Sequence, residues 1–200
     1  MIKSGLDLLM LLLYANKQEK IEGITKLVKL LFLLIKEGNF KEFEKEYGFE
    51  TYNYGPWSSQ VLNFTETVRE MNLIKSEERE LKRYEERDVD LIEAEVDVAE
   101  IPELVENEIF IFSLTADGLK VGRVLYKRLT EDERTKIEDI KKKFNRMSLS
   151  ELIRYVYLKY PEFTKKSKIK EKFIPRSMFG VSPELRSLSA IYFGVYKNIG

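Results

Sequence analysis

The sequence contains no cysteine and no histidine. Without cysteine the chain can form neither disulfides nor thiolate metal sites. Without histidine it lacks the side chain that most often transfers protons near neutral pH and binds transition metals. Carboxylates are abundant in "DVDLIEAEVDVAE", but this stretch lacks the glycine turn of a calcium loop. We therefore expect a protein that is not an enzyme and that uses no metal and no cofactor.

Long apolar runs are also absent. The longest are "LLMLLLYA" (8–15) and "LLFLLI" (30–35), far short of the roughly 20 residues that span a bilayer. Asp7 interrupts the first apolar region, and no signal-peptide cleavage site follows it. Only 2 glutamines accompany 27 glutamates and 23 lysines, a bias typical of proteins from very hot environments. We expect a cytoplasmic protein without membrane contact, from a thermophilic source.

Charge is balanced in total but separated along the chain. There are 34 basic and 34 acidic side chains, yet residues 76–112 hold 4 basic and 14 acidic ones, whereas residues 113–200 hold 20 basic and 10 acidic ones. The basic region, residues 141–176, contains 12 basic and 3 acidic side chains. Such a separation indicates either two charged faces that meet each other or a surface for a charged partner.

Apolar spacing and capping residues predict a mainly α fold with a small β element. Ser4 and Asp7 resemble a capping box before a first helix with one apolar stripe, formed by Leu6, Leu9, Met10, Leu13 and Tyr14. A second helix follows Gly23, and its apolar positions surround it so widely that it should be central. Residues 109–114 alternate as a strand does. Three further helices should begin after Thr115, Thr130 and Ser148, and a last one near Ser182.

The stretch "YNYGPWSSQV" (52–61) groups two tyrosines, a glycine, a proline and the only tryptophan of the chain. Gly55 permits unusual backbone angles, and Pro56 suits the first position of a helix. We therefore expect a third helix that begins at Pro56 and ends near Asn72, with Trp57 in its first turn against the core. Its apolar stripe should consist of Trp57, Val61, Phe64, Val68 and Met71.

Residues 5–75 resemble a known family. "GITKLVKLLFLL" followed by "YNYGPWSSQVLNFTETVREMNLI" is similar to the Panacea, or SocA-like antitoxin, domain, in which a Lys-Leu-x-Lys-Leu-Leu helix precedes a Tyr-x-x-Gly-Pro turn. Family members that neutralise toxins do so by protein contact, so the resemblance does not imply DNA binding. Contacts would come from Tyr52, Tyr54 and Trp57, together with the acidic segment. The matching residues are Lys26, Leu27, Lys29, Leu30, Leu31, Tyr52, Gly55 and Pro56.

The order of elements resembles a winged helix-turn-helix. Three helices precede a hairpin-like acidic segment, and "LTADG" (114–118) is similar to the Leu-Thr-x-x-Gly turn that follows the wing in many such regulators. We expect a winged-helix-like or Panacea-like domain over residues 1–129, with an acidic hairpin insert at 76–112. Residues 130–200 should form a basic helical extension.

A DNA-binding role would use two sets of residues. The third helix offers Ser59, Gln60 and Asn63, whose side chains can hydrogen-bond base edges. The tyrosines of "RYVYLKYPEF" suit stacking on bases, although their helical spacing equally predicts core packing. Phosphate contacts would come from Lys141, Lys142, Lys143, Lys165, Lys166, Lys168 and Lys170.

Two functions remain open at this point. The first is a non-catalytic winged-helix regulator that binds double-stranded DNA, dimeric through its long helices. The second is a Panacea-like antitoxin or adaptor that binds a toxin or an acidic protein surface. The acidic insert argues against DNA binding, because it would repel phosphates. The polar residues of the third helix and the lysines are explained equally well as an ordinary solvated surface. Element order and the basic region favour the DNA-binding homodimer.

Overall fold

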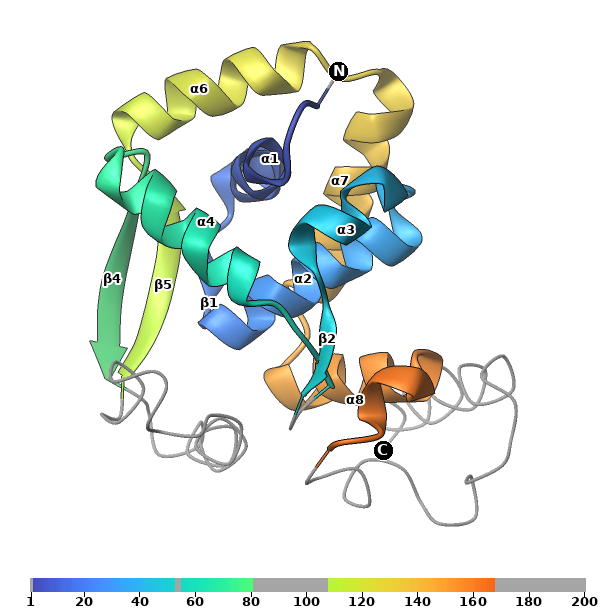
Figure 1. Cartoon of the computed structure of the whole chain (residues 1–200). Helices are drawn as coiled ribbons and strands as arrows, with labels where there is room; N and C mark the ends of the chain where they lie inside the picture. Colours follow the sequence, from blue (N-terminus) through green and yellow to red (C-terminus); the bar gives the residue numbers. More distant parts are fainter. Residues whose placement is uncertain (1, 53–54, 81–107, 168–200) are drawn as a thin grey trace, which may run out of the picture.

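The computed structural model describes residues 2–52, 55–80 and 108–167. They form a mainly helical fold with two small antiparallel sheets (Figure 1). The predicted last helix near Ser182, Tyr54, Lys168, Lys170 and most of the acidic insert lie outside the described residues. The helices are α1 (Gly5–Gln18), α2 (Ile24–Glu37), α3 (Glu44–Tyr47), α4 (Ser59–Glu70), α6 (Ala116–Lys127), α7 (Glu131–Phe144) and α8 (Leu149–Lys159), with short 3-10 turns η1 (Lys41–Phe43) and η3 (Pro161–Thr164).

The larger sheet has the strand order β1-β5-β4, formed by β1 (Ile21–Glu22), β5 (Glu108–Leu114) and β4 (Ile74–Glu80). Ile21 lies opposite Phe112 and Ile74 opposite Leu114, so these apolar side chains share the buried side of the sheet. The smaller sheet is a hairpin of β2 (Glu50–Tyr52) and β3 (Gly55–Trp57).

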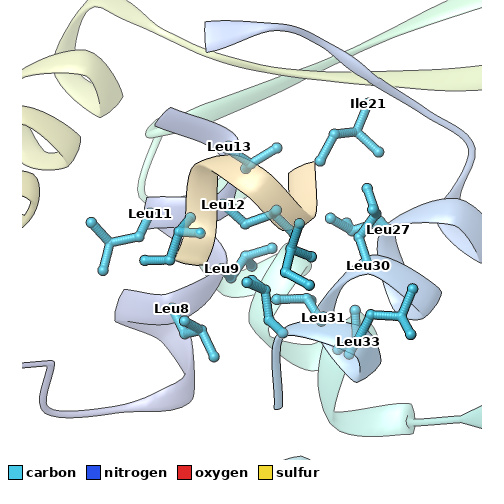
Figure 2. Packing of buried hydrophobic residues seen from close by; sticks show 14 of the residues in the cluster. Leu8, Leu9, Leu11, Leu12, Leu13, Ile21, Leu27, Leu30, Leu31 and Leu33 are labelled. Atoms are coloured by element: carbon cyan, nitrogen blue, oxygen red, sulfur yellow. The ribbon is translucent and has the colours of Figure 1, made fainter. Parts of the chain in front are cut away.

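The core is built around α1 and α2. Figure 2 shows leucines of both helices packed together, and the whole runs Leu8–Leu13 and Leu30–Ile35 are buried. The central position of α2 is therefore confirmed. The single stripe expected for α1 is wrong, because Leu8, Leu11 and Leu12 are as buried as Leu9. Figure 1 shows the reason: α4, α6 and α7 pack on different sides of α1.

The starts of α1, α6, α7 and α8 follow the predicted caps. The Thr115 hydroxyl accepts a hydrogen bond from the Gly118 N–H, and both Thr130 and Ser148 form complete capping boxes. Ser4 forms half a box, since its hydroxyl accepts from the Asp7 N–H while the Asp7 carboxylate accepts from the N–H of Lys3. These local signals can be recognised because each needs only residues that are neighbours in sequence.

Residues after 129 share the core of the residues before it. Ile137 and Phe144 of α7 and Val156 of α8 belong to the same apolar cluster as α1 and α2. The division at residue 129 therefore does not separate two hydrophobic cores in the described part of the chain. No helix within residues 2–52, 55–80 and 108–167 has the length and apolarity needed to cross a membrane.

Candidate interaction surfaces

The Gly-Pro turn lies in a hairpin, not at a helix start. Gly55–Trp57 forms β3, with Glu50 opposite Trp57 and Tyr52 opposite Gly55. The third helix, α4, begins only at Ser59. Its cap is Ser58, whose hydroxyl accepts from the Val61 N–H at 3.3 Å. The prediction that Pro56 opens the helix is wrong, because pairing with β2 keeps residues 55–57 extended.

Two buried side chains, one from α2 and one from α8, contact this hairpin. Lys29 of α2 is 1% exposed, and its Nζ donates a hydrogen bond to the Pro56 carbonyl at 2.9 Å. Tyr157 of α8 is fully buried and lies so close to Gly55 that a Cβ there would be 2.8 Å from its Cε1. The lysine-rich helix and the Gly-Pro turn, separate in sequence, therefore form one structural unit.

The importance of Tyr157 was not apparent from the sequence. In the sequence, Tyr157 lies on the apolar side of the predicted helix and looks like any other core residue. Only the fold shows that its ring requires a glycine on another element. Lys29 carried a weak signal, since a lysine in the middle of an apolar helix must find a hydrogen-bond partner when it is buried.

The hairpin carries an aromatic pair. The rings of Tyr52 and Trp57 are stacked, with centroids 6.0 Å apart and an interplanar angle of 30°. Both side chains are half-buried. Trp57 packs on the core, as predicted, but from β3 rather than from the first turn of the helix. The Thr51 hydroxyl, 3.5 Å from the Glu162 carbonyl of η3, joins the hairpin to the chain that follows α8.

The exposed face of α4 is polar and contains few cations. Ser59 and Asn63 are exposed, whereas Gln60 is half-buried, and its side-chain oxygen accepts from Asn63 Nδ2 at 3.4 Å. Arg69, the basic residue of the helix, forms an ion pair with Glu66 at 2.5 Å. Met71 was expected on the core stripe but is 59% exposed, because the helix ends at Glu70 and the chain turns toward β4.

Lys141 is buried, so the expectation that it contacts phosphate is wrong. Its side chain is fully inaccessible, and its Nζ donates to the carbonyls of Leu13 and Ala15, each at 3.0 Å. Burial lowers the pKa of Lys141 to about 7, and the nearby Glu19 carboxylate acts in the opposite direction. Lys141 fixes the end of α1, where Asn16 and Lys17 leave helical geometry with φ angles of 51° and 55°.

The remaining cations of the basic region divide into different settings. Lys142 is exposed, and Lys143 lies over the rings of Phe144 and Tyr155, with Nζ 4.7 and 5.1 Å from their centroids. Lys165 and Lys166 are exposed after η3. One uniform outward row of cations is therefore absent from the described part of this region.

Tyr155 of α8 and Tyr160, the residue after the helix, are half-buried and pack against the core. The Glu37 carboxylate at the end of α2 accepts hydrogen bonds from the hydroxyls of Tyr155 and Tyr160 at 3.0 to 3.1 Å. Burial, followed by the negative charge of Glu37, raises the pKa of both tyrosines. Lys159 completes the cluster, with its Nζ 3.0 Å from Glu37. Core packing is confirmed for these rings, and stacking on bases would require them to leave this network.

Comparisons with known protein families, curated proteins and solved structures found no match. The surfaces themselves therefore carry the functional argument. They are the aromatic hairpin, the polar face of α4 and the divided set of lysines.

Proposed function

We propose that this chain is a non-catalytic protein-binding module of the Panacea-like kind, and that its contact surface is the β2–β3 hairpin. The observation that carries the proposal is the stacked, half-buried pair of Tyr52 and Trp57 on a hairpin anchored by Lys29 and Tyr157. In this proposal the chain acts as an antitoxin or adaptor, with a toxin as the partner that the resemblance implies.

Physical reasons favour this surface. Aromatic side chains dominate the binding energy of protein interfaces, because they bury a large area at a small cost in side-chain entropy. A site held rigid before binding loses less entropy when the partner arrives. The hydrogen bond from Lys29 to Pro56 and the contact between Gly55 and Tyr157 supply this rigidity.

Electrostatics weaken the DNA hypothesis. Duplex DNA gains most of its non-specific affinity from cations that neutralise phosphates. On α4, Arg69 is paired with Glu66, and Glu70 lies one turn beyond Glu66. Lys141 is buried, so the basic region loses the first of its cations. These contacts leave the proposed reading helix without the positive charge that DNA requires.

A single fluorine probe tests the hairpin directly. Because Trp57 is the only tryptophan, protein labelled with 5-fluorotryptophan should give one ¹⁹F resonance. Adding the purified, unlabelled product of a neighbouring gene should shift this resonance. The Tyr52→Ala variant should bind that partner at least about tenfold more weakly, the loss of one interface hot spot.

The control is Glu42→Ala, an exposed residue of η1 away from the aromatic pair. It should bind like the wild type, and thermal denaturation should show that all variants are folded. A partner that binds without moving the Trp57 resonance, or that binds the Tyr52 variant equally well, would show that the hairpin is only scaffold.

The winged-helix regulator is the alternative function. It is favoured by the order of α1, α2 and α4, followed by the antiparallel pair β4–β5 and then α6, with β1 as third strand. In this hypothesis Ser59, Gln60 and Asn63 face bases, and lysines 142, 143, 165, 166, 168 and 170 face phosphates.

Salt titration separates this alternative from protein binding. If the chain is a DNA-binding regulator, its affinity for random duplex DNA should fall steeply as the salt concentration rises. Changing one phosphate-contacting lysine to alanine should reduce the slope of log affinity against log salt concentration by about one. Absence of binding at low salt would exclude the DNA hypothesis.

A further inference from the structure

Helix α6 presents an exposed basic face with an apolar side chain in it. Arg123 and Lys127 lie one turn apart, and neither forms an ion pair or side-chain hydrogen bond within residues 2–52, 55–80 and 108–167. Val124, next to Arg123, is 50% exposed. Gly118 and Gly122 fix the opposite face, since a Cβ there would lie 1.8 Å from the Leu73 carbonyl oxygen and 2.6 Å from the Tyr14 ring.

Helix α4 presents the matching pattern with opposite charge. Glu66 and Glu70 are also one turn apart and exposed, and Met71, next to Glu70, is 59% exposed. Met71 and Val124 are the large apolar side chains that stay exposed in the described part of the chain. Each helix therefore carries two like charges at i and i+4. On α6 this arrangement is unfavourable until an opposite charge arrives, whereas on α4 Glu66 already pairs with Arg69.

We propose that α4 of one copy of this chain packs against α6 of a second copy. With the two helices antiparallel, Glu70 meets Arg123 while Glu66 meets Lys127. Met71 follows Glu70 in the sequence, and Val124 follows Arg123. These two apolar side chains then cover one another. Glu66 then shares its carboxylate between Arg69 and the partner's Lys127. This costs little stability, because an exposed ion pair contributes little.

A twofold axis allows both halves of this contact to form together. The two helices meet where α4 ends and α6 begins. There the Thr115 hydroxyl donates a hydrogen bond to the Asn72 carbonyl at 2.7 Å, and the Thr115 N–H donates one to the Leu73 carbonyl at 3.0 Å. Figure 1 shows the end of α4 and the start of α6 at the same corner of the molecule, from which α6 runs across the top of the view. One pair of 12-residue helices is short for a stable interface. Two symmetric pairs double the buried area.

A second α6 does not fit the same face. An antiparallel pair of α6 helices centred on Val124 would set cations against cations, which is unfavourable. An acidic helix with an apolar residue in register is the better complement, and α4 is such a helix.

Charge exchange between two variants tests this interface. Wild type should dimerise in sedimentation velocity and light scattering, more weakly as salt rises. The variants R123E/K127E and E66K/E70K should each self-associate at least about tenfold more weakly. An equimolar mixture of the two should dimerise again, because each reversed helix then meets its opposite charge on the other variant.

The matched control is K41E/K45E, which reverses two exposed lysines with the same spacing near α3. It should dimerise like the wild type, and circular dichroism should show that every variant is folded. A wild type that stays monomeric at the highest attainable concentration would overturn the proposal. So would reversed variants that still dimerise alone, or a mixture that stays monomeric. The hairpin is unchanged throughout, so these results do not depend on the proposed partner binding.

Discussion

At Gly55 the backbone has a φ of 94°, and a Cβ would lie 2.8 Å from Cε1 of Tyr157. We expect Gly55→Ala to lower the unfolding free energy by about 2–4 kcal/mol, since backbone strain and a steric conflict with a fully buried ring combine. Gly48→Ala is the control: its φ is 56°, but no atom lies within 4 Å, so it should cost only about 1–2 kcal/mol. Equal losses in urea denaturation would mean that Tyr157 moves aside.

Lys141 should make stability depend on pH. Burial lowers its pKa to about 7 from an ordinary value of 10.5. Between these values the unfolded chain keeps a proton that the folded chain has released, so the unfolding free energy rises with pH. A neutral amine has two N–H donors, which match the two carbonyls of Leu13 and Ala15.

Comparison with Lys141→Met isolates this effect. The stability of wild type relative to the variant should increase by about 2 kcal/mol from pH 7 to pH 9, as one proton is released. Chemical denaturation at several pH values measures the difference. Parallel curves for the two proteins would show that Lys141 stays charged in the folded state.

Helix α8 is attached to α2 through Glu37, whose side chain is only 15% exposed. Glu37→Ala removes the acceptor of the Tyr155 and Tyr160 hydroxyls and the partner of Lys159. We expect a loss of about 1–3 kcal/mol, because half-buried donors are left without an acceptor.

Glu44→Ala is the control for this element. Glu44 pairs with Lys36 but its side chain is 44% exposed, so its removal should cost less than about 1 kcal/mol. Denaturation of the two variants gives the comparison. A similar small loss in both would mean that α8 is held by apolar packing alone.

At the scale of elements, the sequence predicted what local signals encode. Thr115, Thr130 and Ser148 were identified as caps because each cap is satisfied within four residues. The prediction for Pro56 was wrong because its strand conformation depends on pairing with β2 and on the hydrogen bond from Lys29 of α2. Both partners belong to other elements. Proline is acceptable in either setting, so its identity could not decide between them.

At the scale of the whole molecule, helices α7 and α8 complete one core with α1 and α2. A fragment of residues 1–129 would expose the apolar surface that Ile137, Phe144 and Val156 cover. We expect this fragment to lack a cooperative unfolding transition, because a core that has lost one side cannot offset the entropy of folding. Calorimetry of the fragment checks it. A cooperative transition would support the predicted domain division.

The sequence by itself determined the mainly helical fold, the buried character of α2 and the starts of the capped helices, because periodicity and caps act between near neighbours. Only the tertiary structure decided which charged residues are available. Lys141 and Lys142 are adjacent and chemically identical, yet one is buried against the end of α1 and the other is exposed. Adjacent residues on a helix point in different directions, and what they meet there depends on elements far away in the chain.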